Sequence, residues 1–342
     1  MSSLFERVVS LLFGAPKGGD VDRSLVDETT EAIVEIVEPK VRLRSGYRDK
    51  LADSVQRTIT HLGDLGRTLP QQALTLSRQA WADDPYVRAF FAAAADVPIC
   101  IGRCEELRRF FDQHPQCTQA YALLGMRRSE RQILAPRLEG DEVRQDVAQT
   151  TVSFGGYRLL APAAELAQAR QGVGRRIMQR LAQLVLQRVA GIGQQTQDLQ
   201  MRKALLGVRL RMLRAGRDGM QPLVGDGPSF EQQIREVERE LKETGAEYAE
   251  ARGALATLDD YIEHINAVFG EPQAHVSLQR TLLRVSRMGV KVDEASGGET
   301  DGLELAELSI GDGLHATIVF VRIPRDELPP QEDLLEQAQR AL

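Results

Sequence analysis

The sequence predicts a mainly α protein with three parts: a helical N-terminal domain, a small α+β head, and a long antiparallel coiled-coil hairpin inserted into that head. Three observations lead to this fold class. Aromatic residues make up only 5% of the 342 residues, while Ala, Leu, Arg, Gln and Glu dominate, which is typical of helices and coiled coils. An apolar stripe at alternating spacings of four and three runs through residues 230–265. Two groups of short strand-like segments, bounded by glycines, lie on either side of it.

The overall charge, the apolar runs and the cysteine usage limit the classes of protein to which this chain can belong. The formal net charge is −6 and the pI is about 5.6, which argues against a globally basic nucleic-acid-binding protein. No run of apolar residues is long enough to cross a membrane, and Glu6 and Arg7 interrupt the apolar stretch that a signal peptide needs. Three cysteines in a long chain fit a reducing compartment. We therefore expect a cytoplasmic protein, with the inner face of a membrane as the alternative location.

The N-terminal segment, residues 1–14, is expected to form a short amphipathic helix. Its apolar side carries Leu4, Phe5, Val8, Leu11 and Leu12. These five residues are the candidate partner-binding site. The only basic residues nearby are Arg7 and Lys17, so attraction to anionic lipid would be weak. We therefore expect this helix to bind a protein surface, and a membrane surface is the alternative.

The next part of the chain, residues 20–140, is predicted to be a helical domain. Apolar residues recur at helical spacing between Pro, Gly and Asp signals that start and stop helices. The first expected helix is capped by Asp20 or Asp22 and stops before Pro39, the next runs from Tyr47 to the closing stretch at 66–70, and the others cover about 71–82, 85–95 and 98–113.

The head is predicted from residues 145–161 and 288–325. Its early part is expected to be a β-hairpin of 147–154 and 157–161, turning at Gly155-Gly156. The late part reads as three strands, at 289–293, 303–310 and 314–323. A lone two-stranded hairpin is marginal in water, so we expect the two groups to share one sheet. A C-terminal helix is expected at 330–342.

Between the two strand groups, residues 162–287 are expected to form the coiled-coil hairpin. One continuous helix is predicted over 229–269, packed antiparallel on 176–216, with a turn at 216–228. Its apolar stripe is Phe230, Ile234, Val237, Leu241, Thr244, Tyr248, Ala251, Leu255, Leu258, Ile262 and Ile265. The facing stripe is expected to be Met178, Leu181, Val185, Val189 and Ile192, followed after a kink at Gly191 and Gly193 by Met201, Leu205, Val208 and Met212.

The two arms of this hairpin have opposite charge. Residues 170–217 contain eleven Arg or Lys and one acidic residue, whereas residues 229–271 contain eleven Asp or Glu and four basic residues. The simplest interpretation is that the basic side chains of one arm pair with the acidic side chains of the other along the hairpin. The basic arm could also bind phosphate backbones, but its acidic partner would compete, so we do not expect a nucleic-acid partner.

The cysteine cluster is the one place where a metal site is conceivable. Cys100, Cys104, His114 and Cys117 offer three thiols and an imidazole, a ligand set that suits zinc. However, Cys100 and His114 would lie about 21 Å apart along a continuous helix. We expect the thiols to be core residues without a metal; a zinc or haem site and a reactive Cys117 beside His114 are the alternatives.

No catalytic motif is present. The sequence has neither a phosphate-binding loop nor a nucleophile elbow, and Asp259, Asp260 and Glu263 are expected on a solvated helix face. The sequence therefore gives no support for an enzyme, a catalytic residue or a cofactor. The function hypothesis is a scaffold or adaptor that uses the coiled-coil hairpin for protein–protein interaction or self-association. The alternatives are a peripheral membrane assembly protein anchored by the N-terminal helix, and a metal- or haem-binding protein.

Overall fold

The structure is a computed structural model, and it describes residues 22–139, 142–220, 230–287, 289–292 and 300–330. The fold is mixed, because long helices are combined with a six-stranded sheet. The predicted fold class, mainly α with a small head, is therefore wrong, because the sheet is larger than the sequence pattern indicated. The candidate binding residues Leu4, Phe5, Val8, Leu11 and Leu12 lie outside the described residues, as does most of the predicted C-terminal helix.

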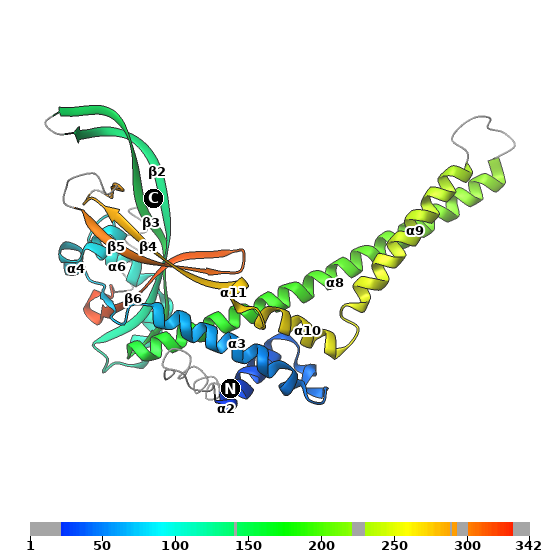
Figure 1. The fold of residues 1–342 in the computed structure, drawn as a ribbon, viewed down its shortest axis with the longest axis horizontal. Coiled ribbons are helices and arrows are strands. Elements are labelled where there is room, and N and C mark those ends of the chain that lie inside the picture. The colour runs from blue at the N-terminus through cyan, green and yellow to red at the C-terminus, as the bar shows by residue number, and fades with distance from the viewer. Residues whose placement is uncertain (1–21, 140–141, 221–229, 288, 293–299, 331–342) are drawn as a thin grey trace. The chain divides into compact units, whose positions relative to one another are not determined.

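The helices and strands follow one another along the chain as Figure 1 shows. The α-helices are α2 (Arg23–Val37), α3 (Tyr47–Thr68), α4 (Arg78–Asp83), α5 (Pro85–Phe90), α6 (Asp96–Gly102), α7 (Glu105–Gln113), α8 (Leu166–Met220), α9 (Phe230–Gly253), α10 (Leu258–Phe269) and α11 (Pro272–His275). Short 3-10 helices are η1 (Pro39–Leu43) and η2 (Arg325–Glu327). The strands are β1 (Leu74–Thr75), β2 (Gln119–Glu139), β3 (Glu142–Ala163), β4 (Val276–Val285), β5 (Asp301–Ile310) and β6 (Leu314–Pro324).

The strands form one sheet with the order β3-β2-β6-β5-β4, in which neighbours are antiparallel, and β1 adds to β6 in parallel. Strand β6, the most apolar of the late strands, is central and pairs with β2 so that Ala122 lies opposite Val321. The expectation that the early and late strand groups share one sheet is confirmed.

Two of the strands lie within regions that the sequence predicts to be helical, β2 in the domain 20–140 and β4 in the insertion 162–287, and they account for the wrong fold class. Strand β2 consists largely of Ala, Leu, Arg, Glu and Gln, which favour helix when considered alone. It pairs with β3 along most of its length and with β6 from Gln119 to Met126, and this tertiary pairing overrides the local preference. Strand β4 was likewise assigned to the helical insertion.

The predicted turn at Gly155-Gly156 is also wrong, because β3 continues through it. Gly155 pairs with Arg127 inside the strand, and the register with β2 shifts between Gly125 and Arg127. Gly156 has a φ of 65°, which only glycine adopts readily. The glycine pair therefore marks a β-bulge within one long strand.

Residues 289–292 connect the two outer strands of the sheet. Thr151 of β3 bridges to Val290, and Val285 of β4 bridges to Lys291. The amide of Val152 donates to the Gly289 carbonyl over 2.8 Å. Gly289 has a φ of 73°, and a Cβ there would lie 3.1 Å from the Val152 carbonyl oxygen. The close approach of the two chain segments therefore requires glycine.

The chain divides into two compact units. The first comprises the described parts of Met1–Thr29, Val55–Arg180 and Glu271–Leu342, and the second comprises Thr30–Ser54 and Leu181–Gly270. In the first unit, α5, α6 and α7 cover one face of the sheet. Their buried residues, among them Phe91, Ile101 and Phe111, join Leu124 and Val321 of the sheet in one core.

The other face of this sheet contacts the parts of α3 and α8 that belong to the first unit. The Arg170 guanidinium of α8 lies 5.1 Å from the ring centre of Phe320 on β6. The imidazole Nε2 of His61 on α3 lies 2.8 Å from the Val276 carbonyl oxygen of β4. The central strand β6 is therefore buried on both faces, at Phe320 on one and Val321 on the other, whereas Leu134 near the far end of β2 is 70% exposed.

The second unit is helical and differs from the predicted hairpin in the course of both of its long helices. The expected continuous helix over 229–269 is broken into α9 and α10 at residues 254–257. Thr257 caps the start of α10 in a capping box: the Thr257 side chain accepts a hydrogen bond from the Asp260 amide, and the Asp260 side chain accepts one from the Thr257 amide. Helix α8, by contrast, continues through Gly191 and Gly193 without a break.

Candidate interaction surface

The second unit contains an antiparallel pair of helices, formed by α8 from Leu199 onwards and by α9, which we call the helical arm (Figure 1). Its core consists of Leu206, Leu210, Ile234 and Val237, with Leu213 and Leu241 packed against it. Each of the four core residues is less than 9% exposed. The α9 side of the predicted apolar stripe does face α8, as expected.

Polar contacts fix the antiparallel direction of the arm. The ammonium of Lys203 lies 5.4 Å from the ring centre of Tyr248. Further along α8, Arg214 donates to Glu238 over 2.6 Å. The contacting residue number therefore increases along α8 as it decreases along α9, so the two helices are antiparallel. The predicted attraction between the basic and the acidic helix is present in the Arg214–Glu238 pair.

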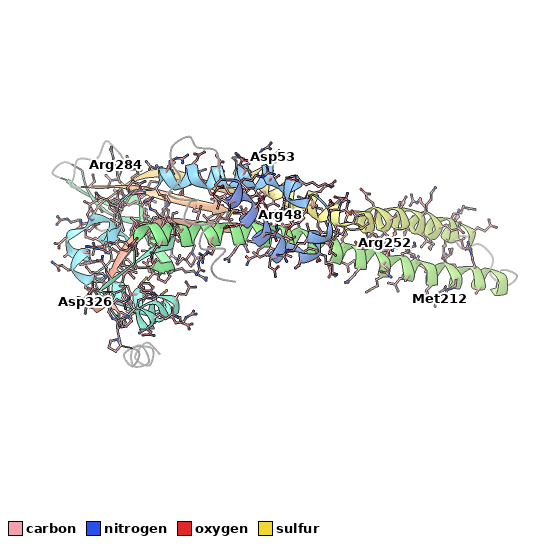
Figure 2. The ribbon with its side chains drawn as sticks, turned by 90° about the horizontal axis from the view of Figure 1, so that it is seen from below. Arg48, Asp53, Met212, Arg252, Arg284 and Asp326 are labelled. Carbon is pink, nitrogen blue, oxygen red and sulfur yellow. The ribbon has the colours of Figure 1, made fainter. Side chains whose placement is uncertain are left out.

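The last four α8 residues of the predicted facing stripe are exposed, whereas Met178, Leu181 and Val185 of the same predicted stripe are buried. Met201 is 65% exposed, Leu205 65%, Val208 38% and Met212 69%. We call these four residues the outer stripe. Figure 2 shows Met212 on the side of α8 that points away from α9. The prediction that these residues belong to the seam between the helices is therefore wrong.

The geometry of α8 explains this difference. The helix carries two apolar stripes, since successive residues turn by about 100°. Leu206 and Leu210 point to one side, and the outer stripe lies about 140° away around the axis. Both stripes show the four-and-three spacing, so spacing alone does not tell which one faces α9. The sequence signal for the side that faces α9 is the second stripe, which contains Leu206, Leu210 and Leu213.

Basic side chains border the outer stripe. Arg202 and Arg209 lie on one side and Arg211 on the other, and all three are exposed. From Leu199 to Arg217, α8 contains six Arg or Lys and no Asp or Glu. The outer stripe is thus an apolar strip with a positive border.

The acidic cluster predicted on the second arm has a structural role. Asp259 accepts from Arg44 over 2.9 Å and from Lys50 over 2.6 Å, and these partners hold the pKa of its carboxyl below the usual value. Asp260 belongs to the capping box of α10. Neither carboxylate is placed in a desolvated cleft of the kind that catalysis uses.

The cysteine cluster belongs to the core of the first unit. Cys100 is buried, and burial raises the pKa of its thiol to about 12. Cys104 and Cys117 pack against the same core, and the Cys104 Sγ lies 3.5 Å from the Leu159 carbonyl oxygen. The His114 ring stacks on Phe110 with its centre 4.6 Å away. The prediction that the thiols are core residues is confirmed.

The alternative of a metal or haem site finds no geometric support in this cluster. Within the described part of the chain, no three His, Cys, Asp or Glu side chains are grouped so that they could hold a metal ion. The Nδ1 of His114 lies 2.9 Å from the Phe110 carbonyl oxygen of its own helix, so this ring is oriented by α7 and not by the thiols.

Two hollows in the first unit were not predicted. The larger, of about 770 Å³, lies between the start of α8 and the end of β3 and includes the Arg176–Glu106 ion pair of 2.6 Å. The smaller, of about 350 Å³, is lined by aromatic residues such as Trp81 and includes an ion pair of 3.0 Å between Arg88 and Asp301. In each hollow an arginine is held by a carboxylate from another element, which stabilises the fold at that point.

Comparisons with known proteins provide no relative, since no family model, curated protein or solved structure matches this chain. Among the described residues, none of the helices is both long and apolar enough to cross a membrane.

Proposed function

We propose that the protein is a scaffold or adaptor that binds another protein through the helical arm. The observation that carries this proposal is the outer stripe, four large apolar side chains in a row on one exposed helix face. Single exposed apolar residues are common on protein surfaces, whereas a contiguous apolar patch with a polar rim usually marks an interaction site. In this proposed function, α9 packs on one side of α8, as in a coiled coil, and the opposite side of α8 binds the partner.

The outer stripe can supply part of the binding free energy of a complex, and contacts beyond these four residues must supply the rest, because association itself costs about 4–15 kcal/mol. Fully burying a Leu, Val or Met side chain contributes about 1.5–3 kcal/mol. With exposed fractions between 38% and 69%, covering all four would contribute about 4–7 kcal/mol before the cost of association. Polar contacts at the basic border would add specificity and speed of encounter more than affinity.

The arm also has the length that an interaction element needs. At about 1.5 Å per residue, the 24 residues of α9 extend over about 36 Å. We propose a location in the cytoplasm, supported by the cysteine usage of the sequence.

The test is affinity capture from lysate of cells that naturally produce the protein. The intact chain is compared with a variant carrying Leu205→Gln and Met212→Gln, two substitutions on the exposed side of α8. We expect a protein that is retained by the intact chain and lost from the variant, with both chains unfolding at the same temperature. Equal retention by both chains, or no specific retention by either, would refute the proposal.

A further inference from the structure

We infer that the outer stripe binds one acidic amphipathic helix of a partner protein, which packs on α8 opposite α9. This inference deepens the proposed function and rests on it. It is carried by the shape of the stripe, by the charge at its border, and by the way in which α8 already binds α9.

The shape of the stripe fits a single helix. Met201, Leu205, Val208 and Met212 follow each other at spacings of four, three and four, and lie within about 60° around the helix axis. Such a narrow strip is the seam that a coiled-coil partner covers. Helices that lie on a bilayer have a broader apolar face, of about 100° or more. The stripe therefore favours a helix over a lipid surface.

The charge at the border selects an acidic helix. Arg202, Arg209 and Arg211 occupy the positions beside the seam, where opposite charges choose the partner of a coiled coil. No acidic residue of α8 lies between Leu199 and Arg217 to neutralise them. Glutamates at the corresponding positions of the incoming helix would meet these arginines, whereas lysines there would be repelled.

The inner side of α8 supplies the precedent within the same molecule. There α9, a helix with seven glutamates and four basic residues, packs its apolar residues Ile234 and Val237 on Leu206 and Leu210. Arg214 of α8 pairs with Glu238 at the edge of that contact. The outer stripe repeats the combination of apolar seam and basic border.

A second copy of the chain does not fit the stripe. Two α8 helices packed stripe to stripe would bring arginine borders together, and like charges at these positions oppose pairing. The exposed side of α9 has acidic residues, such as Glu243 and Glu247, whereas the large aliphatic residues Ile234, Val237 and Leu241 of this helix pack against α8. Since neither of these two faces of a second copy combines an apolar seam with acidic borders, the occupant that we infer is a helix of another protein.

The test uses designed peptides and the full-length chain. One helical peptide carries Leu at the two seam positions of each heptad and Glu at the bordering positions, and the matched peptide carries Lys in place of Glu. Binding is measured by fluorescence anisotropy at low and high salt. We expect the acidic peptide to bind at least about tenfold more tightly than the basic one, with the difference shrinking as salt screens the border.

Two variants assign the binding to the stripe. Leu205→Gln with Met212→Gln is expected to abolish binding of the acidic peptide, while Glu243→Gln with Glu247→Gln, on the exposed side of α9, should leave it unchanged. Circular dichroism and thermal unfolding check that each variant folds. Equal binding of the two peptides, or binding that survives the stripe variant, overturns the inference.

Two further results would also overturn it. One is stripe-dependent sedimentation with phosphatidylglycerol vesicles in the absence of peptide binding, which would identify a membrane surface. The other is stripe-dependent self-association of the full chain, which would identify a second copy. If capture from lysate depends on the stripe but neither peptide binds, the partner chemistry inferred here is wrong and the proposed function stands.

Discussion

The assignment of the two faces of α8 can be tested by a matched pair of substitutions, Leu210→Ala and Leu205→Ala. Both remove the same atoms from the same helix, so their effects on helix propensity are equal. Leu210 is 8% exposed and packs on α9, whereas Leu205 is 65% exposed. The difference between the two variants therefore measures the contact with α9.

The size of the effect follows from burial. Truncating a buried leucine to alanine costs about 2–5 kcal/mol, and a pair of helices open to solvent on both sides belongs at the lower end, about 2 kcal/mol. Leu205→Ala should cost less than about 0.5 kcal/mol. Because about 1.4 kcal/mol is a factor of ten, opening of the arm should become about 30-fold more frequent in the Leu210 variant.

The assay is native-state hydrogen exchange of the α9 amides from Ile234 to Thr244. Local opening of the arm exposes these amides without unfolding the sheet, so the amides of β6 should exchange at the same rate in both variants. If the Leu205 variant accelerates exchange in α9 as much as the Leu210 variant does, the outer stripe is not on the outside and the account of the arm is wrong.

Three other substitutions or reactions test the rest of the fold. Gly289→Ala forces a side chain into a positive φ beside the Val152 carbonyl and should destabilise the first unit by about 1–3 kcal/mol, visible as a lower melting temperature, whereas Gly302→Ala, where a Cβ meets nothing within 4 Å, should cost less than half as much. Thr257→Ala removes the capping box and should cost about 1 kcal/mol, measured as faster exchange of the first α10 amides, with Thr257→Ser as the conservative control. Burial raises the pKa of Cys100 to about 12, so its thiol should resist iodoacetamide at pH 8 in the folded chain. Because the unfolded thiol ionises near pH 8.5, the contribution of Cys100 to stability should decline as the pH rises from about 9 towards 12, and a flat stability profile over that range in the parent, matching Cys100→Ala, would contradict it.

The sequence patterns that predicted correctly are those in which local and tertiary preferences agree. Strands β5 and β6 combine strand formers with glycine turns, and the need of an early strand for partners correctly placed it in their sheet. The α9 stripe, with Ile234 and Val237, is apolar on one side only, so its packing face was unambiguous. The same holds for Cys100, an apolar-stripe position that became core.

The errors arise where a sequence allows two answers. Strand β2 is built from helix formers, and nothing local shows that β3 and β6 will flank it. Glycine marks both turns and bulges, so Gly156 was read as a turn although it is a bulge. The break before α10 depends on the Thr257–Asp260 cap, which interrupts an otherwise regular stripe. On α8, two stripes have the same spacing, and in the structure Leu206 and Leu210, rather than Leu205, pack against α9.

The sequence shows that the outer stripe exists, but it does not show that the outer stripe is exposed. Met201, Leu205, Val208 and Met212 stand out as a stripe, yet only the position of α9 shows that they remain uncovered. The basic border of the outer stripe can also be read from the sequence, because Arg202, Arg209 and Arg211 are its sequence neighbours. The hollows beside Arg176 and Arg88 had no sequence signal, because their walls come from segments far apart in the chain.

The most direct test of the central claim, that the outer stripe is where a partner binds, is site-specific photo-cross-linking in cells that naturally produce the protein. A photoreactive benzoylphenylalanine replaces Leu205 on the stripe in one version and Glu243 on the exposed side of α9 in another. The account predicts a discrete cross-linked product from position 205 and none from position 243. A product from neither position, or the same product from both, would contradict it.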